Sequence, residues 1–204
     1  MRYREILNEM PELIDATDFN MMDPAKNAWL SEKLLSTKNR EIIEEDERGL
    51  LFRVGDREGN VALYDKRDQR IVYWIRFKTF RNKLIGEPVT QIILWRDVDS
   101  DLTTNITKHV FFDYLLPKWG IIMSDAKQTA QGRDFWRSRM AQAAGLGLNV
   151  GLLNMNSQKI EWFDSSQQNI SNWLKSHLNV WGKHDEGPYK ESNPYQGLRF
   201  VISQ

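Results

Sequence analysis

The chain contains no cysteine among its 204 residues. That absence excludes disulfide bonds, a thiolate nucleophile, cysteine-ligated zinc and iron–sulfur clusters. An excess of either charge is also missing, since 28 Lys and Arg residues balance 28 Asp and Glu residues. Proteins that mainly hold a nucleic-acid backbone carry a surplus of basic residues, so we do not expect nucleic acid as a partner.

Long hydrophobic runs are absent too. No apolar stretch approaches the roughly 18 residues of a membrane span, and residues 1–5 lack the apolar stretch of a signal peptide. We therefore expect a cytoplasmic protein without membrane attachment. Aromatic residues are abundant instead, with 8 Trp, 6 Tyr and 9 Phe. They suffice for a sizeable core and exclude wholesale disorder.

Residues 1–46 are expected to form an N-terminal helical segment. Asp23-Pro24 is a typical helix start, because a capping residue precedes proline at the first helical position. The apolar residues of 29–35 then follow helical spacing. We interpret the acidic run at 44–47 as a solvated face at the end of this segment.

From residue 49 onward the hydrophobic period changes to two, which is typical of strands. Four short strands are predicted, joined by short polar links in an antiparallel meander. Trp and Tyr occur on both faces of the third strand, so we expect the sheet to be covered on both sides. The four predicted strands are 50–54, 61–64, 71–77 and 91–98.

The second half alternates between strands and helices. A strand that reaches the next through a covering helix is normally its parallel neighbour, so we expect 91–98 and 120–124 to run parallel. The predicted fold class is α+β, with a mixed, mostly antiparallel sheet flanked by helices. We expect one domain over 47–204 after the N-terminal segment. The predicted elements are helices at 104–119, 129–145 and 170–181, and strands at 120–124, 150–153, 159–163 and 198–202.

This element order, together with residues 119–136, resembles the GNAT-like N-acyltransferases. The stretch contains Ser124-Asp125, then Thr129-x-x-Gly132, then Trp136. A subset of that family, including divergent members encoded by phages, has a similar pattern where a central helix leads through a strand into the next helix. The resemblance covers roughly residues 50–155 and rests mostly on topology.

The resemblance implies transfer of an acyl group from acetyl-CoA or another acyl-CoA to an amine. The implied catalytic residues are Asp97, Ser124 and Asp125. Ser124 and Asp125 follow a predicted parallel strand, the edge that ligand sites favour, although a plain strand-to-helix turn is the alternative. The residues implied to bind the cofactor are Trp95, Arg96, Thr129 and Arg133.

The sequence departs from the family at the loop that binds the pyrophosphate. The family has a glycine-rich loop there, which lets backbone amides approach phosphate at a helix N-terminus. Here residues 97–105 contain no glycine and three aspartates, Asp97, Asp99 and Asp101. Their charge predicts weak binding of coenzyme A or none. Alternate carboxylates also suit Mg²⁺ or Ca²⁺, but we favour a solvated loop that caps the next helix.

Residues 142–147 (Gln-Ala-Ala-Gly-Leu-Gly) match the letters of a phosphate loop but follow a predicted helix. We predict that Gly145 ends that helix and that the segment binds no phosphate. The histidines lack metal-ligand spacing, so we expect no metal site. Arg133 and Arg137 share a helix face, which we interpret as a salt-bridged surface.

A binding module that keeps this scaffold without the cofactor is the alternative function. Such a protein acts through its aromatic surface, as a phage structural, host-interaction or anti-defence protein, with a protein partner or as a homodimer.

Overall fold

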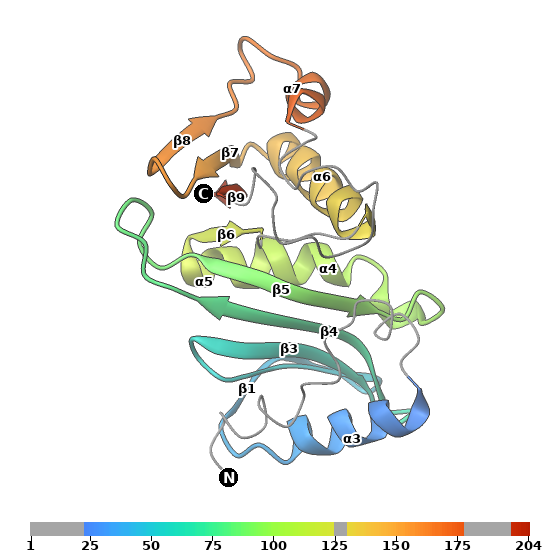
Figure 1. The fold of residues 1–204 in the computed structure, drawn as a ribbon. Helices are drawn as coiled ribbons and strands as arrows, with labels where there is room; N and C mark the ends of the chain where they lie inside the picture. Colours follow the sequence, from blue (N-terminus) through green and yellow to red (C-terminus); the bar gives the residue numbers. More distant parts are fainter. Residues whose placement is uncertain (1–22, 125–129, 178–196) are drawn as a thin grey trace. The chain divides into compact units, whose positions relative to one another are not determined.

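The computed structural model describes residues 23–124, 130–177 and 197–204. Its fold is α+β, with a mixed, mostly antiparallel open sheet flanked by helices, as the sequence predicts (Figure 1). The chain divides into two compact units. The first comprises residues 1–79 and 91–110, and the second comprises 80–90 and 111–204.

The sheet of the first unit is the predicted meander with one strand added at its edge. Its order is β1-β2-β3-β4-β5, and the pairs from β1 to β4 are antiparallel. Residues Ile71 to Ile75 of β4 are all buried, so both faces of this strand are covered, as predicted. The strands are β1 (Arg40–Glu45), β2 (Gly49–Val54), β3 (Glu58–Asp65), β4 (Arg70–Thr79) and β5 (Val89–Arg96).

The prediction of a helical segment up to residue 46 is wrong over 40–45, where the chain forms β1. The acidic run at 44–47 spans the end of β1 and the start of the turn between β1 and β2. The Asp46 side chain accepts the backbone N–H groups of Arg48 at 2.8 Å and Gly49 at 2.6 Å. These hydrogen bonds lower the pKa of Asp46 below its usual value, and the bond from Gly49 has the largest effect. Because β1 pairs with β2, one sheet includes residues on both sides of position 46, where we expected the helical segment to end.

Helix α3 (Pro24–Leu35) begins as the sequence predicts. Asp23 is the N-cap, and its carboxylate accepts the Lys26 N–H at 2.7 Å. Leu30 and Leu34 are buried in a cluster with Phe52 and other apolar residues of β2 to β5. The helix therefore lies on one face of this sheet (Figure 1).

A buried side chain, Asn27, joins α3 to strand β4. Its Nδ2 donates to the Ile71 carbonyl at 2.8 Å, and its Oδ1 accepts the Ile71 N–H at 2.9 Å. Ser31, one turn further along α3, donates to the same Oδ1 at 3.2 Å. Asn27 is 5 % exposed, so these polar groups bond to one another where water has little access.

The helical stretch predicted over 104–119 is present but irregular. It comprises α4 (Ile106–Lys108), a π-helix η3 (His109–Leu115) and α5 (Leu116–Trp119), and ends at Gly120 with φ 73°. Pro117 has no N–H to donate, so a regular α-helical ladder cannot run through it. Asn105, and not an aspartate of the 97–105 loop, is the N-cap, with φ 60°, and it forms no side-chain cap, contrary to the predicted capping by that loop.

The second unit contains β6 (Ile121–Met123), β7 (Asn149–Asn154), β8 (Lys159–Trp162) and β9 (Leu198–Ser203). The first two residues of β5 also belong to this unit, and they pair with β6 in parallel, Val89 with Ile122 and Thr90 with Met123. The predicted parallel arrangement is confirmed.

The last strand, β9, lies between β6 and β7 and is antiparallel to both. β6 and β7 therefore run in the same direction, as expected for strands linked through helix α6 (Ala130–Gly145). Helix α7 (Ile170–Ser176) follows β8. The predicted continuation of this helix to residue 181 lies outside the described residues.

Aromatic rings fill the core of the second unit. Trp136 is fully buried, with its ring 6.0 Å from that of Phe111. Trp173 packs against Phe163 and Phe200. Among the described aromatic residues of this unit, Trp162 of β8 is the exception, with 45 % of its surface exposed. In the described part of the chain, no helix is both long and apolar enough to cross a membrane.

Candidate functional site

Asp97 directly follows β5, where the resemblance places a catalytic group. Its Oδ2 lies 2.6 Å from Nη1 of Arg70, and the Asp97 side chain is only 14 % exposed. Its Oδ1 accepts the backbone N–H of Asp99 at 3.0 Å. Both oxygens of this carboxylate are therefore engaged within the first unit.

Asp101 is held in the same way by a second arginine. Arg48 donates from both terminal nitrogens to the two carboxylate oxygens of Asp101, each at 2.8 Å. This two-pronged bond lowers the pKa of Asp101 and raises that of Arg48. Two of the three loop aspartates, Asp97 and Asp101, are thus paired with cations. Each forms its ion pair with a different arginine.

Backbone groups of the loop are also occupied. The Thr103 N–H donates to the Ser100 carbonyl at 3.1 Å, and the Thr104 N–H donates to the Asp101 carbonyl at 3.3 Å. The Thr103 hydroxyl donates to the Asp97 carbonyl at 2.7 Å. The loop closes on itself through a short 3₁₀ turn, η2 (Asp101–Thr103). These residues do not fit a pyrophosphate, which needs converging amide donors and little negative charge.

Trp95 and Arg96 are the last two residues of β5, so their side chains point to opposite faces of the strand. Trp95 is 7 % exposed and belongs to the cluster beneath α3, in contact with apolar residues of that core. Arg96 is exposed. The structure therefore gives Trp95 a packing role, while Arg96 faces solvent.

Ser124 follows β6 and is fully buried. Its N–H donates to the Phe200 carbonyl at 2.9 Å, and its Oγ accepts the Phe200 N–H at 3.0 Å. The residue extends the pairing of β6 with β9 by one step. Ser124 lies in the second unit and bonds to Phe200 of that unit. Asp97 lies in the first unit and pairs with Arg70 of that unit.

The structure does not describe the side chains of the three other residues that the resemblance implies. Asp125 and Thr129 lie outside the described residues. Arg133 lies on α6, but its side chain is not among those that the structure describes. Their roles in catalysis and cofactor binding stay predictions.

The segment at 142–147 ends α6, as predicted, but Gly145 is not the capping residue. The Leu148 N–H donates to the Ala143 carbonyl at 3.0 Å, and the Gly147 N–H donates to the Ala144 carbonyl at 3.1 Å. This is the Schellman pattern, in which the left-handed residue is Gly147, with φ 76°. Gly145 is the last helical residue.

Two histidines have carboxylate neighbours. His109 Nε2 lies 3.2 Å from Glu44 Oε2, and His177 Nε2 lies 3.4 Å from Glu161 Oε1. The His177 Nδ1 lies 2.8 Å from the carbonyl of Trp173 and 3.1 Å from Ser176 Oγ.

The arrangement of Ser176, His177 and Glu161 has the members of a hydrolytic triad but not its geometry. The Ser176 hydroxyl donates to the Trp173 carbonyl at 2.7 Å, and the site lies at the carboxyl end of α7. Carbonyls collect at a helix C-terminus, whereas an oxyanion needs N–H donors. We interpret the cluster as an end cap for α7. Within the described ranges, no group of three or more His, Asp or Glu residues is arranged to hold a metal ion.

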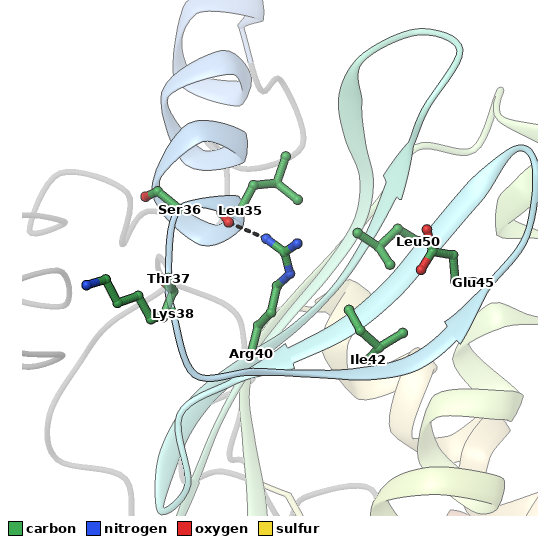
Figure 2. A pocket seen from close by; sticks show the side chains of 8 residues that line it. All are labelled: Leu35, Ser36, Thr37, Lys38, Arg40, Ile42, Glu45 and Leu50. Carbon is green, nitrogen blue, oxygen red and sulfur yellow. Dashed lines mark hydrogen bonds between the residues drawn. The ribbon is translucent and has the colours of Figure 1, made fainter.

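A groove in the first unit was not predicted from the sequence. It has a volume of about 450 Å³ and lies between the end of α3 and the β1–β2 hairpin (Figure 2). Leu35, Ile42 and Leu50 provide apolar surface. Arg40 donates to the Leu35 carbonyl and so caps the end of α3. The remaining lining residues are Ser36, Thr37, Lys38 and Glu45.

The groove was missed because residues 40–45 were expected to be helical. The β-branched pair Ile42-Ile43 next to charged residues was the available signal for a strand. Without that strand there is no hairpin to face the end of α3.

No protein-family model matches this chain, and no curated protein matches it.

Proposed function

We propose that this protein is a non-catalytic binding module on a GNAT-like scaffold, and that it does not use acyl-CoA. One observation carries the proposal: the loop at 97–105 is closed by its own hydrogen bonds and by ion pairs to Arg70 and Arg48. A loop that binds pyrophosphate offers its amides and cations to the ligand instead.

Electrostatics point the same way. The charges of Arg70 and Arg48 are balanced by Asp97 and Asp101, while Asp99 adds negative charge to an exposed part of the loop. Two like charges about 4 Å apart repel by roughly 4 kcal/mol at an effective dielectric of 20. Solvent and salt reduce this value in an exposed loop. The residual repulsion still opposes a ligand that has several phosphate charges.

We place the partner-binding surface at the groove shown in Figure 2. Its apolar side chains suit an apolar residue of a protein partner, and exposed Lys38 beside it suits a carboxylate. Glu45, the acidic lining residue, is already paired with Lys66 at 2.8 Å. The preferred occupant is therefore an apolar segment with an acidic neighbour.

The deciding experiment is a calorimetric titration with acetyl-CoA, supported by thermal unfolding with and without the ligand. We expect no saturable heat and no rise in Tm at millimolar acetyl-CoA, because a ligand that binds the folded state raises its stability. Saturable micromolar binding would overturn the proposal. In that event, an Asp97→Ala variant that binds without turnover would identify Asp97 as catalytic.

N-acyl transfer is the second candidate function. It is favoured by the parallel pairing of β5 with β6 and by the helix α6 that follows Ser124, which is the order on which the resemblance rests. In that function an amine attacks the thioester carbonyl, a base or water takes the amine proton, and the thiolate leaves and is protonated. Release of free thiol from acetyl-CoA in the presence of amines tests it directly.

A further inference from the structure

Strand β8 is the end strand of the sheet in the second unit, and among the described residues it pairs with β7 alone. An end strand presents backbone N–H and C=O groups to whatever lies beside it. The Phe163 N–H donates to the Val150 carbonyl of β7 at 2.9 Å. Backbone groups alternate in direction along an antiparallel strand, so those of Ile160 and Trp162 point away from β7.

The end strand of the first unit, β1, is built to resist pairing. Its register with β2 shifts between Ile42 and Glu44, and such an irregularity twists an edge away from a flat partner. It also carries Glu41, Glu44 and Glu45 among six residues. β8 has an unbroken register with β7 over all four of its residues.

We propose that two copies of this chain pair antiparallel through β8, with the twofold axis at Ile160. Ile160 of each copy then exchanges two backbone hydrogen bonds with Ile160 of the other. In this register Lys159 lies opposite Glu161 of the second copy, on both sides of the axis. The pairing is independent of whether the protein binds coenzyme A.

Charge selects this register. Lys159 is exposed and the Glu161 side chain is 58 % exposed, both on one face of β8. Trp173 Nε1 donates to Glu161 Oε1 at 3.2 Å, which holds the carboxylate in place. Opposite charges facing each other across strands stabilise the pair. Moving the axis to Glu161 would instead place two glutamates face to face.

The other face of β8 supplies apolar surface. Ile160 is half-buried, and Trp162 is 45 % exposed. The Trp162 ring lies over Gly151 of β7, where a Cβ would be only 2.7 Å from Cε3. Across the twofold axis these side chains form a continuous strip of two isoleucines flanked by two tryptophans. Its burial favours association.

Cysteine cross-linking tests the register, because the natural chain has no cysteine. The Cα atoms of a hydrogen-bonded antiparallel pair are about 5.5 Å apart, which suits a disulfide. Under mild oxidation, Ile160→Cys should give a covalent dimer that reductant reverses. Ser157→Cys, an exposed control in the neighbouring turn, should form no covalent dimer because its two copies lie about 20 Å apart across the interface.

Charge exchange is the second test, measured by analytical ultracentrifugation. The unmodified chain should dimerise, Lys159→Glu and Glu161→Lys should each lose the dimer, and mixing these two variants should restore it. A thermal melt confirms that each variant folds. A monomeric unmodified chain, a dimer that persists in Lys159→Glu, or equal cross-linking of the two cysteine variants would each overturn the proposal.

Discussion

Replacing Asn27 by alanine should weaken the first unit more than any exposed substitution on α3. The Asn27 side chain is the hydrogen-bond acceptor for the Ile71 N–H and a donor to the Ile71 carbonyl. Ile71 is fully buried. In Asn27→Ala the N–H loses its acceptor in surroundings where water has little access. Nothing in the alanine side chain replaces either bond.

The expected magnitude follows from the cost of unsatisfied buried groups. One orphaned donor costs about 1–3 kcal/mol, and the lost bond to the carbonyl adds about 1 kcal/mol. We therefore expect a loss of roughly 2–4 kcal/mol in the free energy of unfolding. Urea unfolding, followed by tryptophan fluorescence, measures this loss. Hydrogen exchange at the Ile71 amide should accelerate by a larger factor than at amides of the second unit.

Glu32→Ala is the matched control, because Glu32 is exposed on the same helix. Exposed substitutions away from caps and turns usually change stability by less than about 0.5 kcal/mol. If Asn27→Ala and Glu32→Ala differ by less than that amount, Asn27 does not join α3 to β4 in the way described. Unchanged exchange at Ile71 would refute the same reasoning independently.

Two further predictions concern turns. The folded-state pKa of Asp46 is lowered, so its contribution is complete above the unfolded value near 4 and is lost as pH falls through the folded value. The stability gap between the natural chain and Asp46→Asn, measured by urea unfolding across acidic pH, should therefore shrink toward low pH; a constant gap would contradict this. At the end of α6, Gly147→Ala should cost about 1–2 kcal/mol because its φ is 76°, whereas Gly145→Ala, in open space at the last helical position, should leave stability unchanged or raise it by roughly 0.5–1 kcal/mol. Equal effects of these two substitutions in thermal unfolding would show that Gly147 is not the cap.

Periodicity predicted most of the strands and the main helices, because their apolar residues follow the spacing of a strand or of a helix. β4 is the clearest case, since its residues Ile71 to Ile75 alternate between two covered faces. The start of α3 was predictable for a local reason, as Asp23 and Pro24 determine it through a cap and a fixed φ. The parallel pairing of β5 with β6 followed from a general rule on crossovers.

Features that depend on distant residues were not predictable in this way. β1 is short and mostly charged, and it is a strand because β2 lies beside it. The place of β9 between β6 and β7 is settled by pairings that bring residue 201 to both 123 and 151. The π-helix η3 breaks the expected period within a helix whose apolar residues otherwise fit.

The candidate site shows the same contrast between features that nearby residues predict and features that depend on distant residues. The sequence identified the loop at 97–105 as the place where the chain departs from the family that it resembles, because composition alone reveals the absence of glycines and the presence of three aspartates. It could not reveal what the aspartates do, since Arg70 and Arg48 are 27 and 53 residues away from their partners. Only the meander brings those arginines to the loop. The carboxylates that close the loop are thus the same groups that we expect to oppose a phosphate ligand, so introducing a phosphate site here would require rebuilding this corner of the sheet.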